Sequence, residues 1–123
     1  MNARETLENY GELREKAETK AREIMLCKRQ LAREAASESH LKTRLSRLTR
    51  EQKSLQRQLL RRQKQIEHLL SLLQEEQLRR ILALRYLSLL SYEQIGQALH
   101  FSSRHIYRLH VRGVMALQKI LEA

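Results

Sequence analysis

The chain has 123 residues, and its 24 Lys and Arg residues against 14 Asp and Glu give a formal net charge of +10. It has no Pro and no Trp, and only 4% of its residues are aromatic, a composition typical of long helices around a modest core. This length suits one small domain, or a small domain with an arm. The excess of positive charge favours a polyanionic partner such as nucleic acid.

Several classes of protein are disfavoured by what the sequence lacks. No apolar run reaches membrane-spanning length, and no signal-peptide core is present, so we expect no membrane partner. Cys27 is the only cysteine, which excludes an intrachain disulfide and fits a reducing cytoplasm. We expect Cys27 to be a structural thiol. No Gly-rich phosphate loop, carboxylate pair or activated nucleophile is apparent, so we expect neither an enzyme nor a bound metal or cofactor.

Residues 1–36 are predicted to form a first helix. Its apolar stripe is thin and contains small residues, so the helix needs a packing partner. The stripe consists of Leu7, Tyr10, Leu13, Ala17, Ala21, Ile24, Leu31 and Ala35. Residues 36–40 offer Ser37 and Ser39 as caps for a new helix, although no Gly or Pro excludes a continuous one.

A regular heptad pattern follows from Leu41 to Leu73. Apolar residues alternate in steps of four and three, which predicts a coiled coil, and only Gln52 and Arg62 interrupt the seam. We expect this helix to fold back on the first one as a hairpin. The leucines that one thin helix leaves uncovered then favour a homodimer formed through residues 1–73.

The arm also carries an excess of positive charge. Residues 41–70 contain nine Lys and Arg against two Glu, a net charge of +7. In one interpretation these cations pair with acidic residues of the first helix, which places Glu5 to Glu18 near Arg57 to Lys64. In the other, the arm itself contacts phosphate. The sequence leaves both open.

Residues 74–123 are predicted to form a separate, compact helical domain. Residues 74–90 should be a buried support helix, because their leucines cover more than one helical face. Two further helices follow, with Ser91 and Gln94 spaced as in a capping box and Ser102 as the second cap. The expected core of this domain is Leu78, Ile81, Leu82, Leu84, Ile95, Leu99, Phe101, Ile106, Leu109, Val114 and Leu117. The order of helix, corner and helix is that of a helix-turn-helix.

The second of these helices, residues 103–117, is the candidate recognition helix for a DNA major groove. Its apolar positions share one face, whereas its cationic and hydrogen-bonding residues share the other. Gly96, in the middle of the preceding helix, indicates a close crossing that would offset its helix-destabilising effect. His105 and His110 are five residues apart and so lie on different faces of the helix, which does not suit a shared metal ion. We expect His100, His105 and His110 to be polar surface residues or to lie beside phosphate.

The run LRRILALRYLSLLSYEQIGQALHFSSRHIYRLHVRGVMAL resembles region 4 of sigma-70-type factors. The helix ending LALRY, the first helix SYEQIG and the alanine- and leucine-containing tail of the second helix occur in the family's order over residues 78–121. Nothing upstream resembles the part that reads the −10 element. The layout is similar to that of small phage and prophage regulators of Gram-positive bacteria, which share the helical arm and a YRLH-type segment.

The resemblance implies double-stranded DNA as a partner and transcriptional control as the function. RNA polymerase is a further candidate partner, for the case in which the arm docks another protein instead of joining two copies of the chain. By position it assigns groove contacts to Ser103, Arg104, Tyr107 and Arg108. Ser91, Tyr92 and Ser102 lie at helix starts suited to phosphate, and Arg112 should face the DNA backbone. Two alternatives stay open, namely a small terminase-like subunit for phage DNA packaging and a coiled-coil protein-docking module.

Overall fold

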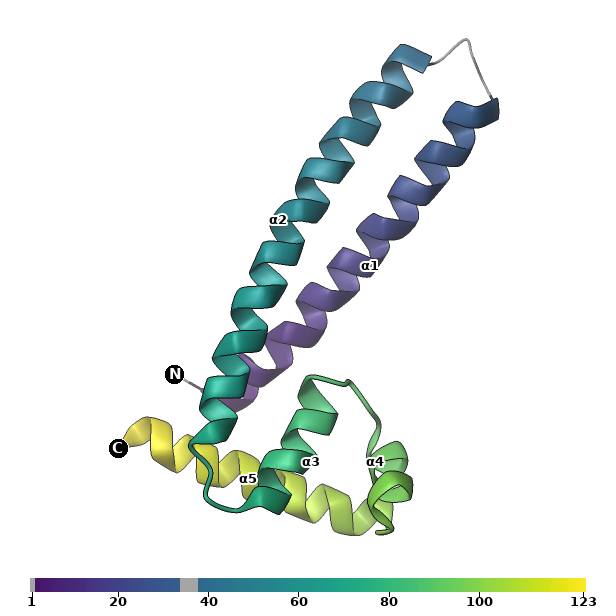
Figure 1. The fold of residues 1–123 in the computed structure, drawn as a ribbon. Coiled ribbons are helices and arrows are strands. Elements are labelled where there is room, and N and C mark those ends of the chain that lie inside the picture. Colours follow the sequence, from purple (N-terminus) through teal and green to yellow (C-terminus); the bar gives the residue numbers. More distant parts are fainter. Residues whose placement is uncertain (1, 34–37) are drawn as a thin grey trace. The chain divides into compact units, whose positions relative to one another are not determined.

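The computed structural model describes residues 2–33 and 38–123 and confirms the expected all-α fold. The helices of this described part are α1 (Ala3–Arg33), α2 (Glu38–Ser71), α3 (Glu76–Tyr86), α4 (Tyr92–Leu99) and α5 (Ser103–Glu122), and Figure 1 shows their order. The chain divides into two compact units, Glu12–Arg61 and Met1–Gly11 with Arg62–Ala123. Within the described ranges, no helix combines the length and apolarity needed to cross a membrane.

In the unit Glu12–Arg61, α1 and α2 pack as an antiparallel helical hairpin, as expected. Its core is a small apolar cluster at the distal end of the two helices. The cluster consists of Ile24, Cys27, Leu41 and Leu48, with Leu31 and Leu45 packed against it. The Cys27 thiol is buried and donates a hydrogen bond to the carbonyl of Leu41, at a Sγ···O distance of 3.4 Å. Nearer the middle, Lys20 Nζ lies 2.6 Å from Glu51 Oε2.

The sequence predicts a break between the first two helices at residues 36–40, and the structure describes part of this segment. Residues 36 and 37 of the expected turn at 36–40, including the proposed cap Ser37, lie outside the described residues, whereas residues 38–40 belong to α2. Ser39 is already inside α2, so it does not cap that helix.

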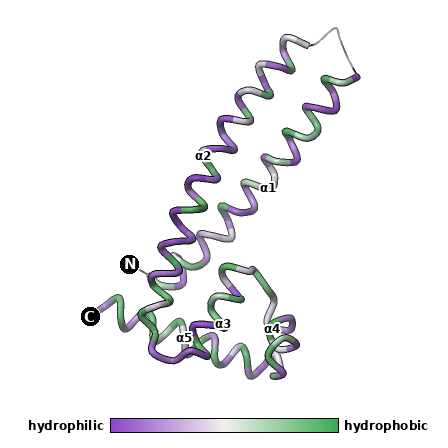
Figure 2. The backbone as a smooth tube through the Cα atoms, in the orientation of Figure 1, coloured by the Kyte–Doolittle hydropathy of each residue, from purple (hydrophilic) through white to green (hydrophobic). Residues whose placement is uncertain are grey.

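The middle of the hairpin is packed less tightly than its end. Leu55 and Leu59 are only half-buried there, although the heptad pattern places them on the seam, and so is Leu13 of the apolar stripe of α1. A groove of about 740 Å³ runs between the two helices, with Glu12, Glu15, Glu51 and Leu55 among its lining residues. Figure 2 shows hydrophobic and hydrophilic positions alternating along both helices. The hairpin therefore leaves part of its apolar seam accessible to another chain.

In the other unit, buried side chains of α3, α4 and α5 form a core, to which the start of α1 and the end of α2 also contribute. The start of α1 contributes buried side chains and donates a hydrogen bond from Ala3 N to Gln118 Oε1 of α5, at 2.8 Å. The buried residues of this unit include Leu7, Tyr10, Ile66, Leu69, Leu70, Leu73, Leu78, Ile81, Leu82, Tyr86, Ile95, Ile106, Leu109, Val114 and Leu117. Three helices of this size bury little apolar surface by themselves. The start of α1 and the end of α2 add to the apolar surface that the unit buries.

Local hydrogen bonds predicted from the sequence cap the starts of α4 and α5, on either side of the corner between them. Ser91 Oγ accepts from Gln94 N at 3.1 Å, and Gln94 Oε1 accepts from Ser91 N at 2.9 Å, which completes the capping box. His100 ends α4 in the left-handed conformation, with φ of 62°. Ser102 Oγ accepts from His105 N and begins α5. An added Cβ on Gly96 would lie 2.5 Å from the carbonyl oxygen of Phe101, so the close crossing expected there is present.

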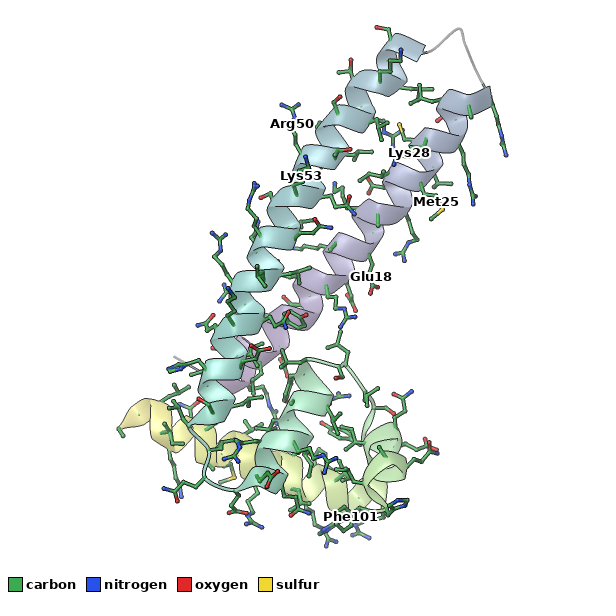
Figure 3. The ribbon with its side chains drawn as sticks, in the orientation of Figure 1. Glu18, Met25, Lys28, Arg50, Lys53 and Phe101 are labelled. Carbon is green, nitrogen blue, oxygen red and sulfur yellow. The ribbon has the colours of Figure 1, made fainter. Side chains whose placement is uncertain are left out.

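Three expectations for this region need correction. The support helix predicted for residues 74–90 ends at Tyr86, and Leu89 then adopts a positive φ of 58°. Leu84 and Leu99, expected in the core, are only partly buried. Phe101 is exposed (39%) because the corner uses its backbone against α4, while its ring stacks on His105 outside the core (Figure 3).

Replacing Gly96 with Ala should destabilise the protein, because the new methyl group would collide with backbone atoms that cannot rotate away. We expect the free energy of unfolding to fall by about 1–3 kcal/mol, the usual cost of overpacking. Urea unfolding followed by circular dichroism measures this change. Gly11→Ala is the matched control, because its Cβ would lie 3.6 Å from Leu89 Cδ2 and should stabilise α1 by up to about 1 kcal/mol. Equal effects of both substitutions would contradict the close crossing.

Candidate nucleic-acid interface

The exposed face of α5 carries the candidate base-reading residues. Ile106, Leu109, Gly113, Val114 and Leu117 bury the opposite face. Ser103, Arg104, Tyr107 and Arg108 are all exposed, and Tyr107 is 50% accessible. Arg104 and Arg108 lie about 40° apart around the helix and about 6 Å apart along it, so they can reach the same groove. Neither guanidinium has a hydrogen bond or ion pair with another described side chain, which leaves both free for an outside acceptor.

The starts of α4 and α5 present polar groups beside this face. Ser91 and Ser102 are exposed, and each hydroxyl oxygen already accepts the backbone bond that caps its helix. Each hydroxyl hydrogen can still be donated, and the first-turn N–H groups of both helices have no partner within their own helix. Such groups suit phosphate oxygens. The expectation for these serines is therefore compatible with their surroundings.

Arg112 is engaged within the protein. Its Nη2 lies 2.8 Å from Oε1 and 2.6 Å from Oε2 of Glu75, which links α5 to the residue before α3. Both side chains are more than half exposed, so the pair contributes little to stability and can exchange for another anion. Arg112 is displaced from Arg104 by about 80° around α5. Sequence reasoning gave Arg112 no protein partner, because Glu75 is distant along the chain.

An aromatic cluster supports the base-reading face from behind. The rings of Tyr92 and Tyr107 meet edge to face with centroids 5.3 Å apart, and the guanidinium of Arg85 lies 4.4 Å from the Tyr92 centroid. Tyr92 also packs on His110, at 5.2 Å between centroids. Tyr92, which is predicted to contact phosphate, has a half-buried ring that packs against Tyr107, and its backbone N–H lies in the first turn of α4. The contact between the two rings fixes where Tyr107 can present its hydroxyl.

His110 corrects the expectation of a surface histidine, because its side chain is 1% exposed. Its Nε2 lies 2.5 Å from the hydroxyl of Tyr86, and its Nδ1 lies 3.5 Å from the hydroxyl of Tyr92. His100 is exposed and His105 is partly exposed. The spacing of His110, four residues after Ile106, already placed it on the apolar face of α5. That signal was present in the sequence.

The surroundings of His110 disfavour its charged form. Burial, together with the positive charges of Arg4 and Arg85, lowers its pKa to about 4. Burial likewise raises the pKa of Tyr86 to about 12, with a contribution from Tyr92. Both groups are therefore neutral at physiological pH, and the bond between them joins α3 to α5 without a buried charge.

The stability of the protein should decrease in mild acid because of His110. In the unfolded chain this imidazole takes up a proton below about pH 6.5, whereas in the folded protein it does so only near pH 4. Its contribution is complete above pH 6.5 and is lost as the pH falls toward 4, by on the order of 3 kcal/mol. Urea unfolding at several pH values measures this loss. His110→Gln keeps a hydrogen-bonding group and should flatten the profile between pH 4 and 6.5, whereas the exposed control His100→Gln should not. Identical profiles for both variants would contradict the role of His110.

Two features of this surface were missed by sequence reasoning. Met115 is 58% exposed and lies about 20° around α5 from Arg104, so an apolar side chain extends the same face. Apolar contact with a thymine methyl group is one use for such a residue. Phe101, with its ring at the outer side of the corner, is the second exposed apolar group. Phe101 was expected in the core because it is hydrophobic, and Met115 was given no role.

Comparison with known protein families agrees with this geometry. Residues 69–119 match the family model described as Sigma-70, region 4. The searches of curated proteins and of solved structures gave no match. The matched segment contains α3, α4 and nearly all of α5, together with every candidate DNA-binding residue. Residues 69–119 therefore form a sigma-70 region 4-like helix-turn-helix, which is a DNA-binding fold.

Proposed function

We propose that this protein is a sequence-specific, double-stranded-DNA-binding transcription regulator that places α5 in the major groove. The observation that supports this most directly is the exposed face of α5, where Arg104 and Arg108 have no partner among the described residues and an aromatic cluster lies behind them. An α-helix fits the major groove, and arginine can bind guanine O6 and N7 with two hydrogen bonds. The region 4-like fold supports the same mode of binding.

The proposed contacts divide into two kinds. Arg104, Tyr107 and Arg108 read base edges, with Ser103 beside them at the start of the helix. Ser91, Tyr92 and Ser102 position the duplex through phosphate oxygens, and Arg112 joins them by exchanging Glu75 for a phosphate. Base contacts determine specificity, whereas phosphate contacts raise the affinity for every sequence.

Arg104→Ala should reduce discrimination between the preferred site and random DNA by about 1–3 kcal/mol, since a guanine contact would be lost. Arg112→Ala should weaken binding to both DNAs alike and lower the salt dependence by about one counterion. Titration of each variant with a selected site and a scrambled duplex, at several salt concentrations, separates these effects. A first selection from a random DNA pool supplies the site. Equal losses on both duplexes for Arg104→Ala would refute its assignment to base reading.

We further propose that residues 1–73 join two copies of the chain and that residues 74–123 bind DNA. The support is the seam of the hairpin, where Leu55 and Leu59 are half-buried and Leu55 lines the groove between α1 and α2. A second hairpin placed on this seam would complete the coiled-coil packing that the heptads predict. Two joined copies would bind an inverted-repeat site more tightly than one, because the second contact becomes intramolecular.

The resemblance to small phage and prophage regulators supports a phage or prophage origin, cytoplasmic action and contact with RNA polymerase. These remain parts of the proposal.

Substituting Asp for both Leu55 and Leu59 should give monomers that bind the full site weakly, because charge on the seam opposes its burial. Light scattering at micromolar concentration gives the mass, and circular dichroism shows whether the helices persist. Leu60→Asp is the control, because Leu60 is 53% exposed and lies off the seam. A monomeric unmodified protein would contradict the dimer, and a ring-sized mass would favour the DNA-packaging alternative.

A further inference from the structure

One face of α2 carries a row of positive charges. Arg50, Lys53, Arg57 and Arg61 follow one another in steps of three or four residues and are all exposed. We call these four residues the basic stripe. They fall within about 80° around the helix and extend about 16 Å along it. Figure 3 shows Arg50 projecting from α2 on the side away from α1.

Three of the four stripe residues, Lys53, Arg57 and Arg61, have no anion in the described part of the chain. None of the four side chains forms a hydrogen bond or ion pair with another described side chain. Glu51, the only acidic residue between positions 50 and 61, is directed elsewhere, since its carboxylate binds Lys20 of α1 at 2.6 Å. That contact lowers the pKa of Glu51 and keeps it ionised beside Lys20. Glu51 also pairs with Arg47 at 3.9 Å and attracts Arg50, so the charges that face outward without a described anion are those of Lys53, Arg57 and Arg61.

This arrangement differs from the charges elsewhere on the hairpin. Acids and bases alternate into ion pairs along α1, as between Arg14 and Glu18 and between Lys20 and Glu23. The expected pairing of acidic residues of α1 with Arg57 and Arg61 is not seen among the described residues. Like charges three or four residues apart destabilise a helix by about 0.2–0.5 kcal/mol per pair. The stripe contains three such neighbouring pairs, so folding alone does not account for it.

We infer that the basic stripe is a second DNA-binding surface, which contacts the phosphate backbone of a double helix without reading its sequence. Closely spaced cations on flexible side chains match the dense charge of a duplex, where each contact releases counterions. A protein partner would call for an apolar centre among the charges, and the stripe has none. A single-stranded nucleic acid would call for aromatic stacking, and α2 contains no Phe, Tyr or Trp. The choice of DNA over another duplex rests on the proposed function.

The test removes three charges from the stripe and, separately, three from α1. The first variant combines Lys53→Gln, Arg57→Gln and Arg61→Gln. The matched control combines Arg22→Gln, Lys28→Gln and Arg29→Gln, which removes one Lys and two Arg from exposed positions that do not form a single row. Glutamine preserves helix propensity in both. Affinity for a random-sequence duplex, measured with the full chain at several salt concentrations, gives the slope of log K against log salt.

The stripe variant should lower the magnitude of this slope by about 2–3, at roughly 0.9 per lost phosphate contact, while the control should lower it by less than 1. At moderate salt the corresponding loss of affinity should be tenfold or more. Equal slopes for the two variants overturn the inference. So does an unchanged slope in the stripe variant, which would direct attention to an acidic protein as the partner.

A third variant separates this inference from the proposed function. Arg104→Ala with Arg108→Ala removes the groove contacts and leaves the stripe intact. If the stripe binds DNA, this variant should retain salt-dependent binding to random duplex, and adding the stripe substitutions should abolish it. Loss of site preference in the groove variant with no effect of the stripe substitutions would support the helix-turn-helix function and reject the stripe. If only the stripe substitutions weaken binding, and the groove variant keeps its site preference, the stripe is supported and the proposed role of the groove arginines is rejected.

Discussion

The close approach of Gly96 to the backbone of Phe101 is the constraint on which the DNA-binding geometry depends. Only a residue without a Cβ allows α4 to lie against the start of α5 at this distance. The left-handed turn at His100 reverses the chain, and the Ser102 cap then fixes the first turn of α5. The direction of α5, and therefore the presentation of Arg104 and Arg108, follows from these three residues. The glycine's cost to helix stability is offset by this function in packing.

A second constraint acts behind the recognition face. His110 is neutral and buried, and its two ring nitrogens face the hydroxyl groups of Tyr86 and Tyr92. Tyr92 in turn contacts Arg85 and Tyr107, so one polar group in the core fixes side chains on α3, α4 and α5. A leucine in place of His110 could fill the volume without orienting these rings. Polar groups in a core are costly unless they are paired, and here the pairing also orients the surface.

The sequence predicted the local features of this protein well. The caps at Ser91 and Ser102 and the corner between them depend on neighbours three to five residues away, so their chemistry is legible in the chain. The prediction that Phe101 lies in the core was wrong, because the backbone of a tight corner decides where its side chain points, whatever its hydrophobicity. The partner of Arg112 could not be predicted, since Glu75 is 37 residues away in sequence. The burial of His110 was predictable from periodicity, but its residue type favoured the surface.

The charges of the chain also divide according to whether the protein itself uses them. Lys20 and Glu51 join the helices of the hairpin, and Arg112 with Glu75 joins α5 to the start of α3. Arg104 and Arg108 on α5, and Lys53, Arg57 and Arg61 of the basic stripe on α2, have no ion-pair partner within the described ranges of the chain. Exposed ion pairs contribute little to stability, so sequestering a few cations in them costs little affinity for DNA. Cations that remain unpaired despite their mutual repulsion lower the stability of the free protein, and a polyanion that neutralises them relieves that repulsion. In the proposed complex with DNA, the same side chains would link binding to folding, because relief of their mutual repulsion would add to the affinity.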